Sequence, residues 1–139
     1  MHSTLRTKIN IGLAIGWGCV AGALLIVAQG TPSFAVVCGG VGGIVSGLLQ
    51  GRAMTVAREA FLTSESALDV RRALTSTSFG KASLAIQWVA CIVLIVMIVT
   101  RTGNLPGILG SLALFFCVRE TSTLPAVVSL NQHERRLNA

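Results

Sequence analysis

The chain has 139 residues, of which 53% are hydrophobic and 12% are charged, and its formal net charge is +6 at pH 7. A soluble domain carries about 25% charged residues, so this composition excludes an ordinary water-soluble protein and indicates a membrane protein. The basic residues flank apolar runs, where they suit anionic lipid headgroups, so we expect the lipid bilayer and no nucleic acid as a partner.

Four apolar runs predict an all-α integral membrane protein with four transmembrane helices in a single domain, residues 1–139. The spans are expected at about 9–28, 33–50, 82–100 and 105–124. The first run, INIGLAIGWGCVAGALLIVA, has the length of about 20 residues that crosses a hydrocarbon core. The second reaches this length only with its flanking residues, the third is the most hydrophobic, and Arg119 interrupts the fourth.

The first run could instead be a secretory signal, because Arg6 and Lys8 precede it and residues 33–35 (SFA) fit a cleavage site. The apolar core of a signal is usually about 7–15 residues. The first run is longer, so we favour a membrane span.

Glycines recur at four-residue spacing in the first two spans. They are Gly12 and Gly16, Gly18 and Gly22, and the row Gly39, Gly43 and Gly47. This spacing places glycines on one helix face, where another backbone can approach closely. Two interpretations stay open: packing of the first span on the second, or association with a further copy or another membrane subunit.

The connections between the spans differ in length. Residues 29–33 (QGTPS) and 101–104 (RTGN) predict tight turns, so the spans should form two hairpins. The connection 51–81 is long and polar, and Ser66 and Asp69 have the spacing of a capping box. We expect a short amphipathic cytoplasmic helix at about 67–74, which lies on the membrane interface or docks a soluble partner. Lipid or partner contacts are predicted for the basic residues of this connection, Arg52, Arg58, Arg71, Arg72 and Lys81.

The distribution of Lys and Arg predicts the orientation. With both termini inside, every basic residue except Arg101 lies on the cytoplasmic face. We therefore expect a multi-pass protein of the bacterial inner membrane with its N- and C-termini inside.

A few polar residues interrupt the apolar spans. Gln87 could form a hydrogen bond across helices. Arg119 is expected to reach the headgroups by snorkelling, and Pro125 is expected to end the span, which leaves 125–139 as a tail. Glu120 is too short to snorkel, so it needs a partner or a protonated state, or it belongs to an embedded ion pair that contacts another subunit or an ion path.

No pattern in the chain predicts catalysis or a metal site. The four Cys lie in apolar runs without a CxxC, and the two His are near the ends of the sequence. Cys19 and Cys91 would both lie near mid-membrane, where they could touch. Because no nucleophile–base pair or phosphate-binding loop is present, we expect neither an enzyme nor a cofactor.

The strings CGG at 38–40 and FGKA at 79–82 occur in a short chain with two apolar hairpins and a basic connection. In these features the chain resembles the subunit I accessory proteins of bacterial F-type ATP synthases. The resemblance implies a role in assembling a ring of membrane subunits. The chain departs from that family in GLLQGR at 47–52, where the family has Pro-Asn, and in Lys81, where it has Glu, so no site residues are transferred.

The function expected from these features is a non-enzymatic accessory or assembly subunit of a membrane complex. One alternative is a homo-oligomeric pore or lysis-type protein, although no span carries the polar stripe that a pore needs. A further alternative is an immunity-type protein that blocks a membrane-active toxin.

Overall fold

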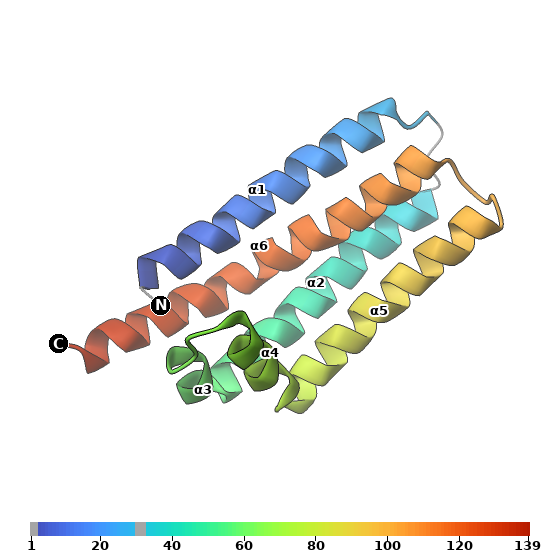
Figure 1. Ribbon diagram of the computed structural model, residues 1–139. Helices are drawn as coiled ribbons and strands as arrows, with labels where there is room; N and C mark the ends of the chain where they lie inside the picture. Colours follow the sequence, from blue (N-terminus) through green and yellow to red (C-terminus); the bar gives the residue numbers. More distant parts are fainter. Residues whose placement is uncertain (1–2, 30–32) are drawn as a thin grey trace.

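The computed structural model describes residues 3–29 and 33–139, and every regular element in these residues is an α-helix (Figure 1). In chain order the helices are α1 (Ser3–Val27), α2 (Ser33–Val56), α3 (Arg58–Leu62), α4 (Ala67–Thr75), α5 (Ser78–Val99) and α6 (Leu105–Leu137). The helices α1, α2, α5 and α6 are long and apolar enough to cross a membrane. This finding confirms the predicted all-helical chain with four candidate spans.

The long helices lie side by side in the order α1, α6, α2, α5 (Figure 1). α6 packs along both α1 and α2, and α2 also packs on α5. The described residues of α1 and α2 do not touch each other. The expected packing of the first span on the second is therefore wrong, because α6 occupies the space between them. The turn expected at 29–33 lies largely outside the described residues.

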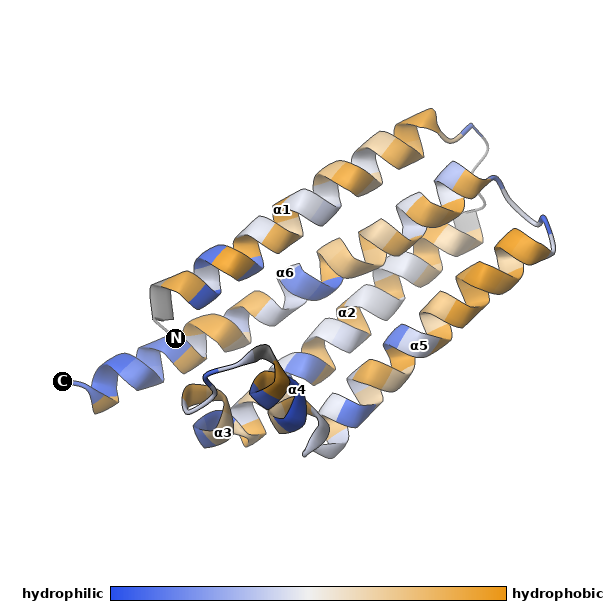
Figure 2. Cartoon of the chain, in the orientation of Figure 1, coloured by the Kyte–Doolittle hydropathy of each residue, from blue (hydrophilic) through white to orange (hydrophobic). Residues whose placement is uncertain are grey.

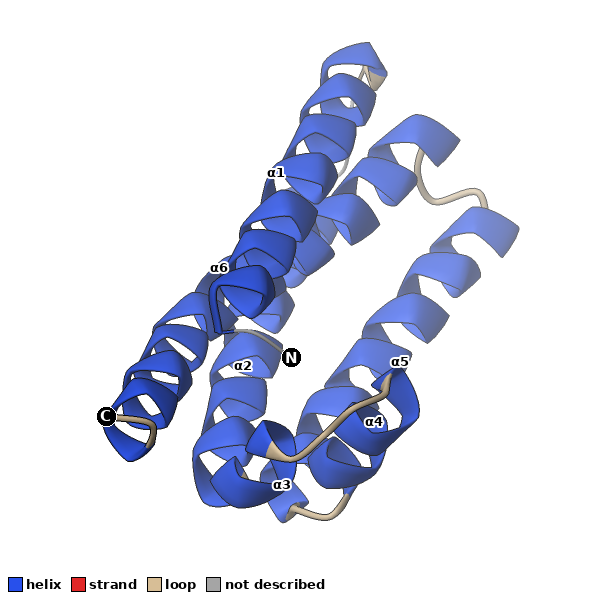
Figure 3. Ribbon diagram, turned by 60° about the vertical axis from the view of Figure 1, so that its left-hand side comes forward, coloured by secondary structure: helices blue, strands red, loops and turns tan. Residues whose placement is uncertain are grey.

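The two ends of the bundle differ in composition. The start of α1 and the end of α6 lie at the same end of the bundle as α3 and α4, here called the terminal end (Figures 1 and 3). The turn between α5 and α6 lies at the other end, here called the turn end. Hydrophilic residues gather at the terminal end, whereas the long helices are mostly apolar (Figure 2). One hydrophilic turn interrupts α6 near its middle.

α6 is a single helix of 33 residues that passes through Pro125. The expected break at Pro125 is therefore wrong, and residues 125–137 are helical. Proline removes one backbone donor, but the helix is held on both sides of it. The Thr123 hydroxyl donates to the Arg119 carbonyl oxygen at 2.8 Å, and Leu130 is buried further on. At 1.5 Å per residue α6 is about 50 Å long, so it extends well beyond a ~30 Å hydrocarbon core.

The connection between α2 and α5 is more ordered than the sequence indicated. α2 continues to Val56, and the short helix α3 was not expected. The helix predicted at 67–74 is present as α4, and the Ser66 hydroxyl accepts a hydrogen bond from the Asp69 backbone N–H at 3.2 Å. Side chains of α3, α4 and α6 form one buried cluster: Phe61, Ala73, Leu74 and Leu130. The connection therefore packs on the end of the bundle.

Candidate functional site

The glycine row of α2 forms the contact with α6. At each glycine of the row a side chain would collide with the α6 backbone. Added Cβ atoms on Gly39, Gly43 and Gly47 would lie 2.5, 2.6 and 2.6 Å from the carbonyl oxygens of Ser111, Phe115 and Arg119. The contacted residues of α6 also recur every four positions, so the two rows run in the same direction and match in spacing. The row thus serves packing within the chain, against α6, a span that the sequence predicted but did not identify as the partner of this row.

The glycines of α1 divide into two groups. An added Cβ on Gly18 would lie 3.3 Å from the Cys117 sulfur of α6. At Gly12, Gly16 and Gly22 an added Cβ would meet no atom of residues 3–29 and 33–139 within 4 Å. Gly12 is two residues from Asn10, which contacts α6, and this separation places Gly12 on the opposite side of α1. Gly12 and Gly16 therefore form an open glycine face.

The polar residues near the middle of α6 form a covered cluster with α1. Arg119 Nη1 lies 3.6 Å from Glu120 Oε1, and the two side chains are only 14% and 12% exposed. Asn10 Nδ2 donates to Glu120 Oε2 at 2.9 Å. The Arg119 guanidinium lies 6.0 Å from the centroid of the Phe116 ring, which stacks on Trp17 at 5.0 Å. We call Asn10, Trp17, Phe116, Arg119 and Glu120 together the polar cluster.

The position of Arg119 corrects the expectation that it snorkels to the headgroups. Side chains on a helix lean toward its N-terminus, which for α6 is at the turn end. Phe116 is one turn closer to that end, so the guanidinium lies over it and is directed away from the terminal end. Protein atoms cover the charge of Arg119, and Glu120 has the partner that we expected it to need.

Some buried polar atoms of the polar cluster have no hydrogen-bond partner within the described chain. Among the described residues, Arg119 Nε and Asn10 Oδ1 are buried without a hydrogen-bond partner. Nearer the terminal end, Arg6 Nη1 donates to Glu134 Oε2 at 3.3 Å, so α1 and α6 share further polar contacts. Sequence reasoning missed Arg6 and Glu134 because they are distant in the chain and look like ordinary flanking charges.

A hydroxyl pair that the sequence did not predict joins α2 to α5. Ser46 Oγ and Ser83 Oγ are 2.9 Å apart, and Ser83 Oγ also donates to the Ser46 carbonyl oxygen at 2.9 Å. Both residues are buried. Gln87, the residue of α5 for which a bond across helices was expected, is half-buried and forms no side-chain hydrogen bond within residues 3–29 and 33–139. Ser83 therefore has the role expected of Gln87.

The basic residues of the connection are not gathered into one site. Most are exposed on the surface: Arg52, Arg71, Arg72 and Lys81. Arg58 is half-buried, and its Nη1 lies 3.4 Å from His133 Nδ1 at the terminal end. The structure thus places the exposed residues, but not Arg58, where they can meet solvent, headgroups or another protein.

The cysteines are all free in the described part of the chain. Cys19 is on α1 and Cys91 is on α5, and these two helices do not touch. The contact considered between them from the sequence is therefore absent.

Comparisons with protein-family models, curated proteins and solved structures found no match. The resemblance to subunit I accessory proteins therefore stays a prediction that depends on residues 38–40, residues 79–82 and the order of the spans.

Proposed function

We propose that this chain is a small non-enzymatic subunit of a bacterial inner-membrane complex, which it helps to assemble or hold together by helix–helix packing. The observation that carries the proposal is the open glycine face at Gly12 and Gly16. The partner proposed for this face is a transmembrane helix of another membrane subunit.

The reason is the effect of each glycine on the stability of its own helix. A glycine in a helix interior is less favourable than alanine by about 1 kcal/mol. On α2 the close approach of α6 offsets this loss, whereas Gly12 and Gly16 have no such contact with the described residues of the chain. In lipid, association of helices depends on close packing at small residues. A helix from another subunit would supply the contact that these two glycines lack.

The free surface of α1 supports the same proposal. Among the described helices, α1 packs on α6 alone. Cys19 is exposed and lies three residues after Gly16, close to the same face. A second transmembrane helix could therefore approach α1 without disturbing the contact with α6.

Native mass spectrometry of the tagged protein, extracted from its host in mild detergent, tests the proposal. We expect a discrete heteromeric complex for the wild type and its loss when Gly12→Leu and Gly16→Leu are combined. Gly22→Leu is the matched control, because Gly22 is also open but lies about 120° around the helix from Gly16.

Other outcomes would contradict the accessory role. A symmetric homo-oligomer without a partner would favour the pore, and conductance in planar bilayers would then be measured. A monomer that is unchanged by the substitutions would favour the immunity-type protein, to be tested as protection of cells against a membrane-active toxin.

A further inference from the structure

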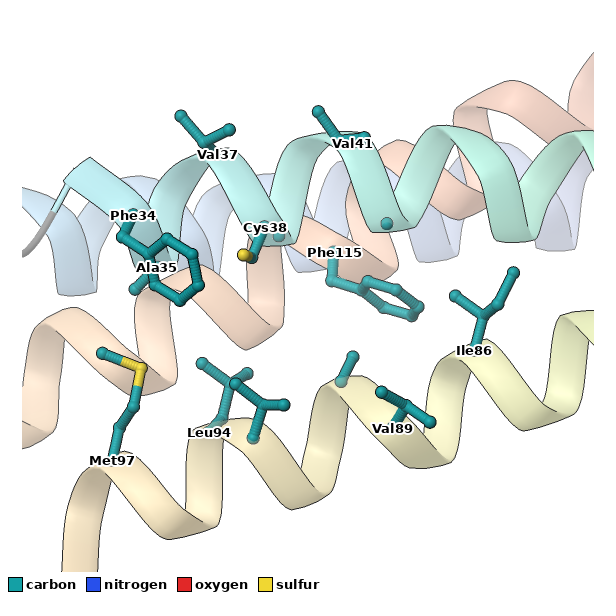
Figure 4. Close-up of a pocket in the computed structure, with 14 residues that line it drawn as sticks. Phe34, Ala35, Val37, Cys38, Val41, Ile86, Val89, Leu94, Met97 and Phe115 are labelled. Carbon is teal, nitrogen blue, oxygen red and sulfur yellow. The ribbon is translucent and has the colours of Figure 1, made fainter. Parts of the chain in front are cut away.

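An apolar groove runs along the bundle between α2 and α5 (Figure 4). Its volume is about 380 Å³. Phe34 and Cys38 of α2 lie opposite Met97 and Leu94 of α5, and the Phe115 ring of α6 lies between the two walls. The Ser46–Ser83 pair joins α2 to α5 on the terminal-end side of the groove residues Gly42 and Ile86, so the groove occupies the part of the bundle that is closer to the turn end.

The shape and lining of the groove fit a lipid chain better than a polar solute. The wall formed by α5 extends from Ile86 to Met97, about 16 Å along the helix axis at 1.5 Å per residue. The residues that line it have apolar side chains or none, so a polar ligand would lose its hydrogen bonds to water without replacement. The groove is parallel to helices that are long enough to cross a membrane, so an acyl chain of a neighbouring lipid can enter it from the side.

A positive charge lies where the headgroup of such a lipid would be. Arg101 is in the turn after α5, one helical turn beyond the groove residue Met97, and it is exposed. It is the only Lys or Arg within residues 86–115. A guanidinium at this position can bind a phosphate through two parallel hydrogen bonds.

The backbone at Arg101 gives an independent reason to assign a role to its side chain. Arg101 has a φ of 53°, the left-handed region that favours glycine. The surrounding bonds form a Schellman motif, in which the Thr102 N–H donates to the Met97 carbonyl at 3.1 Å and the Arg101 N–H to the Ile98 carbonyl at 3.2 Å. Glycine usually occupies this position of the motif. An arginine is strained there, so a contribution of its side chain would explain its presence.

We propose that one phospholipid binds to this groove, with an acyl chain between α2 and α5 and its phosphate on Arg101. The proposal does not depend on which proteins the chain assembles with, nor on which side of the membrane the turn end faces. It assigns to Arg101 the binding of a lipid headgroup.

The test is a titration of the purified protein in mild detergent with dioleoyl phosphatidylglycerol, followed by native mass spectrometry. Ala90→Trp places an indole in the groove, and Ala85→Trp is the control, because Ala85 is an exposed residue of α5 outside the groove. We expect the wild type and Ala85→Trp to bind one lipid tightly. Ala90→Trp should weaken this binding at least tenfold.

The headgroup contact is tested at Arg101. Arg101→Gly should weaken the binding about fivefold, the contribution of one basic residue near anionic lipid. Arg101→Lys should bind more tightly than Arg101→Gly but less tightly than the wild type, because it retains the charge and loses the two parallel hydrogen bonds of the guanidinium. Equal binding by the wild type and Arg101→Gly would overturn the assignment of the phosphate to Arg101.

Equal binding by Ala90→Trp and the wild type would overturn the proposal as a whole. A dimer that Ala90→Trp dissociates would overturn it as well, because a second copy would then occupy the groove. Should Ala90→Trp not fold, Cys38→Trp fills the groove from the opposite wall, with Cys19→Trp on the exposed face of α1 as its control.

Discussion

Single glycines in this chain lie in two different environments. Gly43 lies against the α6 backbone, where an added Cβ would be 2.6 Å from the Phe115 carbonyl oxygen. At Gly12 such a Cβ would have no atom within 4 Å in the part of the chain that the structure describes. The same residue type at the same spacing therefore has opposite tolerance to substitution in α2 and in α1.

Gly43→Ala is expected to lower the free energy of unfolding by about 1–3 kcal/mol, because the methyl group forces α2 and α6 apart. Gly12→Ala should leave the stability unchanged or raise it by up to about 1 kcal/mol, because alanine is the better helix former. Unfolding of the purified variants in detergent measures both. Equal stability of Gly43→Ala and the wild type would show that the glycine row does not set the distance between α2 and α6.

Arg119 and Glu120 balance each other's charge inside the bundle. Removing one partner of a covered ion pair leaves the other charge uncompensated and typically lowers stability by about 3–5 kcal/mol. We expect such a loss for Arg119→Leu, because Glu120 then retains only its bond from Asn10. The double variant Arg119→Leu, Glu120→Leu should be more stable than Arg119→Leu alone.

A double-mutant cycle in detergent, with unfolding as the readout, measures this coupling. Glu120→Leu completes the cycle, and Glu120→Gln, which can still accept the bond from Asn10, separates the loss of the charge from the loss of that bond. If Arg119→Leu unfolds like the wild type, the pair does not stabilise the fold.

Among the elements, α6 departs most from what the sequence predicted. The pattern of apolar residues located its start, but Arg119, Glu120 and Pro125 together indicated an end that does not exist. These signals are local, whereas the contacts that continue the helix come from α1 and α2, which are distant in the chain. In contrast, α4 was predicted well, because its N-cap, Ser66, and its partner Asp69 are only three residues apart.

Pro125→Ala should restore one backbone hydrogen bond in α6 and raise the free energy of unfolding by up to about 3 kcal/mol. The helix content measured by circular dichroism should stay the same, because residues on both sides of Pro125 are already helical. A clear gain in helix content on substitution would instead mean that the helix is interrupted at Pro125.

The arrangement of the helices in the whole molecule could be predicted only in part. Composition and run length located the long helices, and the glycine spacing identified the α2 face that is buried. The partner of that face could not be derived, because a four-residue row fits any helix with a matching row. On α6 such a row is formed by Ser111, Phe115 and Arg119. Their side chains differ in size and polarity, so the row cannot be recognised in the sequence.

The expected orientation, with both termini on the cytoplasmic side, makes a prediction for the whole molecule. Exposed positions at the two ends are Glu65, near α3 and α4, and Thr102, in the turn after α5. In a variant without the native cysteines, a membrane-impermeant thiol reagent should label Thr102→Cys but not Glu65→Cys in intact cells. Permeabilised cells, in which both should react, provide the control. Labelling of Glu65→Cys alone would show that the protein has the opposite orientation.

The placement of α6 between α1 and α2 also constrains how the protein is made. α1 and α2 precede α6 in the chain, and the described residues of these two helices do not touch. During translation the contacts of α1 and of α2 with α6, including the bond of Asn10 to Glu120, can therefore form only after the ribosome has delivered α6. The helix that joins α1 to α2 is thus the last one of the chain to be made.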